Sequence, residues 1–193
     1  MIVPLESAVQ RVDAGVLFGN HHPLEIELGS GDGSFLAHYA GMRRERNFIG
    51  VERLLGRLRK LERKSNRLGL TNVRVVRIEA VYFLQYLLPA RCAEAIHIYF
   101  PDPWPKRKHR KNRLINTRFP LLARAALVPG GAVYLRTDDA DYFAQMKMVF
   151  AASPEFEEVP TPEELAAVQT DFERGFLKRG VQTLRLACRL RGR

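Results

Sequence analysis

The sequence predicts an α/β fold in which helices cover both faces of a doubly wound, mostly parallel β-sheet. Short apolar runs rich in Val, Ile and Leu alternate with segments of helical periodicity along most of the chain. Parallel strands are covered on both faces and therefore read as nearly continuous apolar runs. Regular alternation of such runs with helices is typical of doubly wound sheets, and a glycine-rich turn after one of the runs supports the same fold class.

Five buried strands are expected from these apolar runs. They are LEIEL at 24–28, NFIGV at 47–51, VRVVRI at 73–78, AIHIYF at 95–100 and AVYLR at 132–136. Their length and their content of β-branched residues fit strands better than helices.

Helices are expected between the strands, and the clearest of them covers 53–68. Its leucines fall on one face of a helix and its cations on another, and Gly69 supplies a stop signal. The apolar face is marked by Leu54, Leu58, Leu61 and Leu68, and the basic face by Arg53, Arg57, Lys60 and Lys64. Further helices are expected at 113–127, ending before VPGG, and at 140–152.

The end of the chain departs from the strand and helix alternation. FEEV at 156–159 and VQTLRLACRL at 181–190 read as two strands joined by a loop, which predicts an antiparallel edge near the C-terminus. No internal repeat or long linker interrupts the chain. We therefore expect 1–193 to form a single domain, with 1–22 as a short N-terminal segment.

The net charge of +10 is informative about partners rather than about fold. It favours nucleic acid, with an anionic membrane surface or a general genomic preference for Arg as alternatives. The distribution of the charge narrows the choice, because no Asp or Glu occurs from 103 to 137. The cations of this stretch are Lys106, Arg107, Lys108, Arg110, Lys111, Arg113, Arg118, Arg124 and Arg136.

The two cysteines, Cys92 and Cys188, make no disulfide framework, which fits a reducing compartment. The start, MIVPLESAVQ, lacks the basic and apolar regions of a signal peptide. No stretch approaches the roughly 20 apolar residues of a membrane span. We expect a cytoplasmic protein that does not enter a membrane. The histidines show no metal-ligand spacing, so no metal is expected.

A nucleotide-binding pattern follows the strand at 24–28. Three glycines, Gly29, Gly31 and Gly33, allow a sharp turn and a close approach of the backbone to a ligand. Glu52 ends the next strand, where a carboxylate can accept hydrogen bonds from both hydroxyls of a ribose. Together they predict an adenosine-containing ligand. Glu27 favours S-adenosylmethionine over NAD, since a carboxylate repels pyrophosphate but attracts an ammonium group; a solvated strand-end residue is the alternative.

Glu79 follows the third strand of the series and has two interpretations. In an open α/β sheet this position lies at the ligand crevice, near an adenine. An acidic residue here is equally suited to cap the following helix. The sequence leaves both open.

The segment IHIYFPDPWPKRKHRKNRL carries the most specific signal. Three prolines stiffen the loop that holds Asp102 and Trp104 at the end of a central strand. Open α/β sheets bind their ligands at that edge, and an acid beside an aromatic ring suits a planar base such as guanine. Trp104 packed in the core is the alternative. The basic run after the loop would bring RNA phosphates to the same crevice.

The chain resembles the bacterial single-chain tRNA (guanine-N7-)-methyltransferase family. The resemblance rests on LFGNHHPLEIELGSGDG, GVE, FPDPWPKRKHRKNRL, LRTD and TDFE, which occur in order from about Phe18 to the end of the chain. DPWPK followed by a basic run is highly specific to that family, whereas amino-group methyltransferases show NPPY-like or DPPY-like tetrapeptides. The resemblance implies a Rossmann-like, class I methyltransferase fold with a seven-stranded sheet and an antiparallel edge strand.

The resemblance also implies roles for individual residues. Glu27, Glu52, Glu79 and Asp102 would bind S-adenosylmethionine together with the glycine turn, and Asp102 would be the active-site acid. The residues that would contact tRNA or its guanine are Lys106, Asp138, Thr170, Asp171, Phe172 and Glu173. This sequence departs from the family at three positions. Glu79 replaces Asp or Asn, Asp171 replaces Lys, and Asn112 interrupts the basic run. The N-terminal arm is also short.

The implied reaction is methyl transfer to N7 of a guanine in the tRNA variable loop. N7 carries an unprotonated lone pair at neutral pH, so no general base is required. Asp102 and Asp138 are candidates for stabilising the cationic product or for holding the guanine. An RNA methyltransferase acting on another atom and an RNA-binding module with a vestigial cofactor site remain alternatives. Glu27 and DPWPK argue against an NAD-dependent oxidoreductase.

Overall fold

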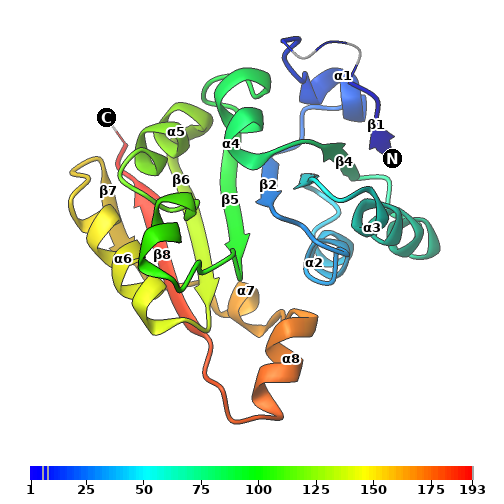
Figure 1. The fold of residues 1–193 in the computed structure, drawn as a ribbon. Coiled ribbons are helices and arrows are strands. Elements are labelled where there is room, and N and C mark those ends of the chain that lie inside the picture. The colour runs from blue at the N-terminus through cyan, green and yellow to red at the C-terminus, as the bar shows by residue number, and fades with distance from the viewer. Residues whose placement is uncertain (6, 8, 193) are drawn as a thin grey trace.

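The computed structural model describes residues 1–5, 7 and 9–192 and centres on one eight-stranded sheet (Figure 1). The strand order is β1-β4-β3-β2-β5-β6-β8-β7. The strands are β1 (Ile2–Val3), β2 (Leu24–Leu28), β3 (Asn47–Glu52), β4 (Val73–Arg77), β5 (Ala93–Tyr99), β6 (Leu127–Thr137), β7 (Phe156–Val159) and β8 (Leu184–Leu190). The strands from β1 to β6 pair in parallel, and β8 pairs antiparallel with both β6 and β7.

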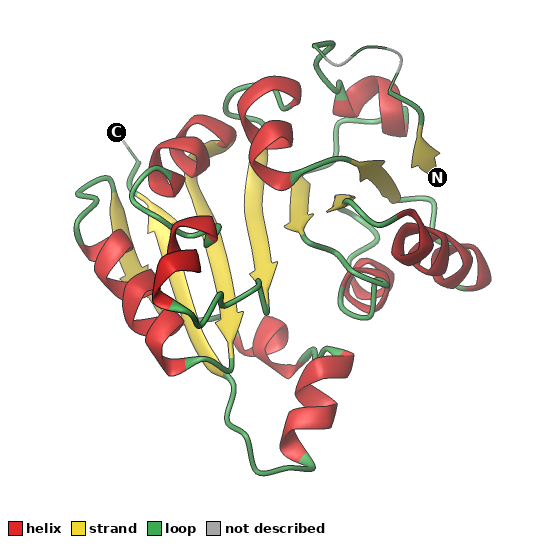
Figure 2. Cartoon of the chain, viewed as in Figure 1, coloured by secondary structure: helices red, strands yellow, loops and turns green. Residues whose placement is uncertain are grey.

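Helices cover both faces of the sheet, as the alternation of elements predicts (Figure 2). One apolar cluster includes residues of α2 (Leu36–Met42), α3 (Leu55–Arg67) and α7 (Glu163–Ala167). The other includes residues of α1 (Ala14–Phe18), α4 (Ala80–Tyr82), α5 (Phe119–Ala126) and α6 (Ala140–Ala151). A π-helical turn, Phe83–Leu87, continues α4, and α8 (Asp171–Leu177) lies beyond the carboxyl end of β5. Within the described residues, no helix is both long and apolar enough to cross a membrane.

The doubly wound sheet and its antiparallel C-terminal strand are confirmed, but the expected count of seven strands is wrong. The eighth strand, β1, pairs Ile2 with Val75 and Val3 with Val76 at the outer edge. Two residues are too few to produce a periodic pattern, so the strand is specified by its neighbour rather than by its own sequence.

The helix expected at 113–127 is shorter than its apolar pattern, because α5 begins only at Phe119. Pro120 lies in its first turn. Proline is tolerated there and disrupts a helix further in, so the helix cannot extend back to 113. At the other end, β6 already begins at Leu127 and runs through the VPGG segment, so the strand starts earlier than the expected 132–136.

The sheet topology locates the site. Between β2 and β5 the chain order reverses, because β3 and β4 lie on one side of β2 while β5 and β6 lie on the other. Loops leaving the carboxyl ends of these neighbouring parallel strands diverge there and open a crevice, which is where open α/β sheets bind ligands.

Candidate functional site

A cleft of about 470 Å³ lies at this point, at the carboxyl ends of β2, β3, β4 and β5. Five residues that the sequence singles out line it together: Gly29, Glu52, Glu79, Asp102 and Trp104. They come from four separate segments. Their convergence therefore depends on the parallel alignment of the strands that precede them.

The glycine turn forms the part of the cleft wall next to β2. Gly29 has a φ of +77°, a conformation that favours glycine, and its N–H donates to the carbonyl of Val51 at 2.8 Å. Gly33 is needed for a different reason. A Cβ on Gly33 would lie 2.2 Å from Cδ1 of Leu61 on α3. The turn is thus held against β3 on one side and against α3 on the other.

Glu52 ties the end of β3 to this turn. Its Oε1 accepts hydrogen bonds from the N–H groups of Arg53 and Leu54 at 2.7 and 2.9 Å, and its Oε2 accepts from the N–H of Gly31 at 3.2 Å. A carboxylate offers about four lone-pair positions. The side chain is therefore rigidly placed in the cleft wall and retains capacity to accept a ligand hydroxyl.

Glu27 is buried within β2, which rules out a solvated strand-end side chain. Its Oε2 has no hydrogen-bond partner among the described residues. Burial raises the pKa of Glu27 to about 8; the charge of Arg136 opposes this shift, while Asp32 and Glu52 add to it. Near neutral pH Glu27 is therefore mostly protonated, and a cation brought to the buried carboxyl group would favour its ionised form.

Glu79 occupies both positions that its place in the sequence allows, at the N-terminus of a helix and at the ligand cleft. Its carboxylate caps α4 by accepting from the N–H groups of Val81 and Tyr82 at 3.0 and 2.8 Å. The same residue lines the cleft. Capping fixes the side chain and does not remove it from the site.

The proline loop after β5 presents Asp102 and Trp104 to the cleft. Phe100 and Trp104 have φ values of +52° and +45°, which bulky residues rarely adopt. Trp104 is half-buried in the cleft wall, with its ring centroid 5.9 Å from that of His109, so it does not lie in the core. Asp102 is exposed at the cleft.

Arg113 holds this loop in place and is not part of the exposed basic surface. Its buried guanidinium donates to the carbonyl of Pro103 at 2.7 Å, to Gln145 at 2.8 Å and to Asp141 at 2.6 Å. The acid-free stretch from 103 to 137 is therefore not one continuous face. Arg136 is also buried, and Arg124 pairs with Glu155 at 3.2 Å.

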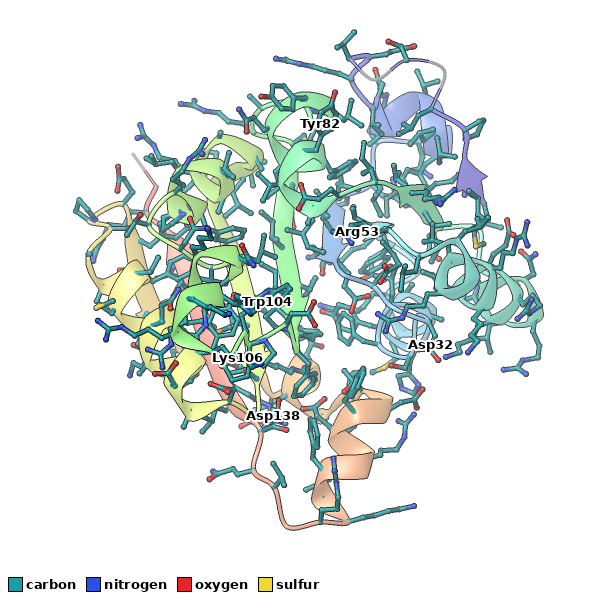
Figure 3. All side chains as sticks on the ribbon, in the orientation of Figure 1. Asp32, Arg53, Tyr82, Trp104, Lys106 and Asp138 are labelled. Atoms are coloured by element: carbon teal, nitrogen blue, oxygen red, sulfur yellow. The ribbon has the colours of Figure 1, made fainter. Side chains whose placement is uncertain are left out.

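The cations from Lys106 to Lys111 do remain exposed, on and just before a 3₁₀ helix, Arg107–Asn112. Arg110 pairs with Asp141 at 3.1 Å. No ion-pair partner within the described chain meets Lys106, Arg107, Lys108 or Lys111. Figure 3 shows Lys106 and Asp138 near the carboxyl ends of β5 and β6, below Trp104.

The segment that begins α8 divides into buried and exposed side chains. Thr170 and Glu173 are buried and form a reciprocal capping box, and Glu173 also pairs with Arg136 and Arg185, each at 2.8 Å. Phe172 is 59% exposed, with its ring centroid 5.9 Å from that of Phe100. Asp171 is exposed and forms an ion pair with Arg174. The capping pair therefore orients α8, while the two residues between them face outward.

Sequence reasoning did not single out some residues that line the cleft. Tyr99 belongs to this group. Asn112 was noted only as an interruption of the basic run, and Arg53 and Arg57 were assigned only to a basic helix face. The helical pattern at 53–68 was the available signal for the two arginines. Their position directly after Glu52, at the carboxyl end of β3, is the signal that could have placed them at the cleft.

Comparisons with known proteins agree on one family. The model of a family described as putative methyltransferase matches residues 21–186. A tRNA (guanine-N(7)-)-methyltransferase of Halorhodospira halophila is 37% identical over 185 residues, covering 93% of this chain and 80% of the relative. One of Alkalilimnicola ehrlichii is 34% identical over 188 residues, covering 95% and 79%.

The fold also matches solved structures. The 16S rRNA methyltransferase KamB superposes with a TM-score of 0.68 at 14% identity, over 94% of this chain and 95% of that one. A second structure, the antibiotic-resistance methyltransferase Kmr, gives a TM-score of 0.62 at 19% identity, over 94% and 92%. At these identities the similarity concerns the fold alone.

Proposed function

Because the chain belongs to the tRNA (guanine-N7-)-methyltransferase family, we propose that it methylates N7 of a guanine in the tRNA variable loop, using S-adenosylmethionine. The observation that carries the proposal is the cleft itself. It joins a glycine turn, two fixed carboxylates and the Asp102 loop at the switch point of the sheet.

The residues present fit S-adenosylmethionine better than a phosphorylated cofactor. Glu52 retains acceptor capacity for a ribose, and Glu79 lies in the adjoining wall. The unpartnered Oε2 of buried Glu27 suits an ammonium group, whereas a pyrophosphate would be repelled. The bound cofactor would supply an electrophilic methyl group on its sulfonium.

The protein's part in the reaction is alignment and charge stabilisation. Guanine N7 has a lone pair and no proton to lose, so no side chain needs to act as a base. The site must hold the base close to the methyl group and in line with it. Asp102 is exposed at the cleft on a constrained loop, where its negative charge would stabilise the positive charge that develops on the guanine. Asp138 lies beyond β6 and would serve the guanine or its ribose.

The exposed cations from Lys106 to Lys111 would hold the phosphates of the RNA beside the cleft. The target would be an unstacked loop guanine, since the edge that carries N7 is not readable in a regular A-form helix. Thr170 and Glu173 would act by orienting α8, so that Phe172 and Asp171 contact the base or the backbone. The alternatives are methylation of another atom and binding without catalysis.

Mass spectrometry of a tRNA digest after incubation with the protein and S-adenosylmethionine tests the proposal. We expect 7-methylguanosine to appear in the fragment that contains the variable loop. The same tRNA with that loop guanine replaced by adenine should gain no methyl group. A methyl group on a different atom would identify another RNA methyltransferase, and tRNA binding without any methylation would identify a binding module.

Cofactor binding should release a proton near pH 6.5, because the raised pKa of Glu27 leaves it protonated in the free protein and an ammonium group favours its ionised form. We expect the affinity to rise by up to tenfold between about pH 6 and 7, where the α-amino group of the cofactor, with an ordinary pKa near 8, is still charged. Calorimetry in buffers of different ionisation enthalpy measures the released proton directly.

Glu27→Gln is the matched control, since it keeps the shape of the side chain and cannot ionise. Proton release and the pH dependence of the affinity should both disappear in this variant. If wild type and Glu27→Gln release the same number of protons, the cofactor does not meet the Glu27 carboxylate.

A further inference from the structure

A row of cations runs along α3 from the edge of the cleft. Its members recur every three or four residues, which places them along one side of the helix. We call them the α3 basic row: Arg53, which precedes the helix, and Arg57, Lys60, Lys64 and Arg67. Arg53 and Arg57 line the cleft. From Arg57 to Arg67 the row extends about 15 Å along the helix axis, away from the cleft.

Few carboxylates of the described chain lie near the side chains of the row. The one acidic residue of α3, Glu62, accepts a hydrogen bond from the N–H of Ile2 at 3.2 Å and is used within the fold. Arg57 lies 3.7 Å from Glu52, and Lys64 lies 3.7 Å from Asp32. Within the described chain, no carboxylate pairs with the side chains of the other three members. Four of the five side chains are exposed, all but Lys64.

The cofactor does not account for these cations. S-adenosylmethionine carries no phosphate, and its single carboxylate belongs to the same amino-acid group as the ammonium that Glu27 would attract. Arg53 and Arg57 stand instead beside Glu52, where the ribose is proposed to bind. Arg77, at the end of β4, adds another exposed guanidinium and donates to the carbonyl of Arg53 at 3.2 Å. A concentration of cations at this rim favours a polyanion outside the cofactor site.

The row lies on the opposite side of the cleft from the exposed cations of the proline-loop segment. Trp104 and Asn112, which flank Lys106 to Lys111, line one wall, whereas Arg53 and Arg57 line the other. Figure 3 shows this separation, with Arg53 on the α3 side and Trp104, Lys106 and Asp138 on the α6 side. A nucleic acid held by both groups would cross the mouth of the cleft between them.

We propose that the α3 basic row is a second RNA-backbone surface, which binds phosphates of the substrate RNA on the far side of the cleft from Lys106 to Lys111. The proposal rests on the proposed function, because it takes RNA as the substrate. The two surfaces hold the strand on both sides of the target nucleotide, and this would position the guanine over the cleft more strictly than one surface alone.

The test is the salt dependence of tRNA affinity for Lys60→Gln/Arg67→Gln, a double variant outside the cleft. We expect the slope of log affinity against log salt concentration to become shallower by about 1.4–1.8, since each lost phosphate contact contributes about 0.7–0.9. Cofactor affinity and the thermal melting temperature should match those of the wild type. The variant Arg59→Gln/Lys147→Gln removes equal charge from exposed positions outside the row, and its slope should stay close to the wild-type value.

The outcomes separate this proposal from the proposed function. If the wild type forms 7-methylguanosine and the row variant keeps the wild-type slope, the row does not contact RNA, although the reaction stands. Equal flattening in both double variants would also overturn the proposal, because it would show an effect of total charge. If the row variant alone flattens the slope while the wild type makes no 7-methylguanosine, the surface is supported and the proposed reaction fails.

Discussion

Asp102→Asn is expected to lower the single-turnover rate of methyl transfer by roughly 10²-fold, with much smaller changes in tRNA and cofactor affinity. The substitution preserves the shape of the side chain and removes the charge that would stabilise the cationic product, and electrostatic terms of this kind are worth about 10²–10³-fold in rate. Asp102 is exposed at the cleft, so the fold should tolerate the change. Rapid-quench measurements with saturating cofactor and excess enzyme isolate the step.

Two comparisons make the result interpretable. Asp138→Asn, at the end of the neighbouring strand, should reduce the rate less if Asp102 carries the main electrostatic role. With saturating cofactor, the wild-type rate should stay level from about pH 6 to about pH 8.5, because guanine N7 has no proton to lose before it attacks. A wild-type rate in Asp102→Asn would show that Asp102 is structural. A rate that climbs from about pH 7 to 9 would indicate a nucleophile that must first lose a proton.

Glu173→Ala is expected to reduce the free energy of unfolding by about 3–5 kcal/mol, because it leaves a buried guanidinium without its counter-charge. Arg136 is 1% exposed and pairs with Glu173 at 2.8 Å. Its remaining hydrogen bonds go to the carbonyls of Leu165 and Val168, which cannot neutralise the charge. The variant also loses the capping box with Thr170. Urea denaturation followed by circular dichroism measures the change.

Glu157→Ala is the matched control. Glu157 also faces two arginines, Arg189 at 2.6 Å and Arg191 at 3.2 Å, but these side chains are more than half exposed. Exposed pairs contribute no more than about 1 kcal/mol, so this variant should remain close to wild type. Equal losses in the two variants would mean that burial of the Arg136 pair has no special effect on stability.

Local patterns in the sequence were sufficient for the framework of the fold and for the position of the cleft. The apolar run at 24–28 coincides with β2, and the glycines after it form the expected turn. Glu52 and Asp102 could be placed because each directly follows or ends a strand, and parallel strands bring their carboxyl ends to one edge. The antiparallel strand near the C-terminus was visible in the sequence as an apolar run outside the alternation of strands and helices.

What the sequence by itself determined is therefore the set of elements and the edge of the sheet at which ligands bind, because hydrophobic periodicity and turn residues act over a few positions. The tertiary structure alone decided which charged groups are used inside the fold. Arg113 and Arg136 belong to an acid-free stretch, yet both are buried beside acceptors that are 28 to 37 residues away in sequence. Burial of a charge requires such a partner, and only folding brings the partner into contact. Folding likewise brought Glu173 to Arg136 and Arg185 as their counter-ion. It brought few carboxylates to the α3 basic row, which stays largely exposed.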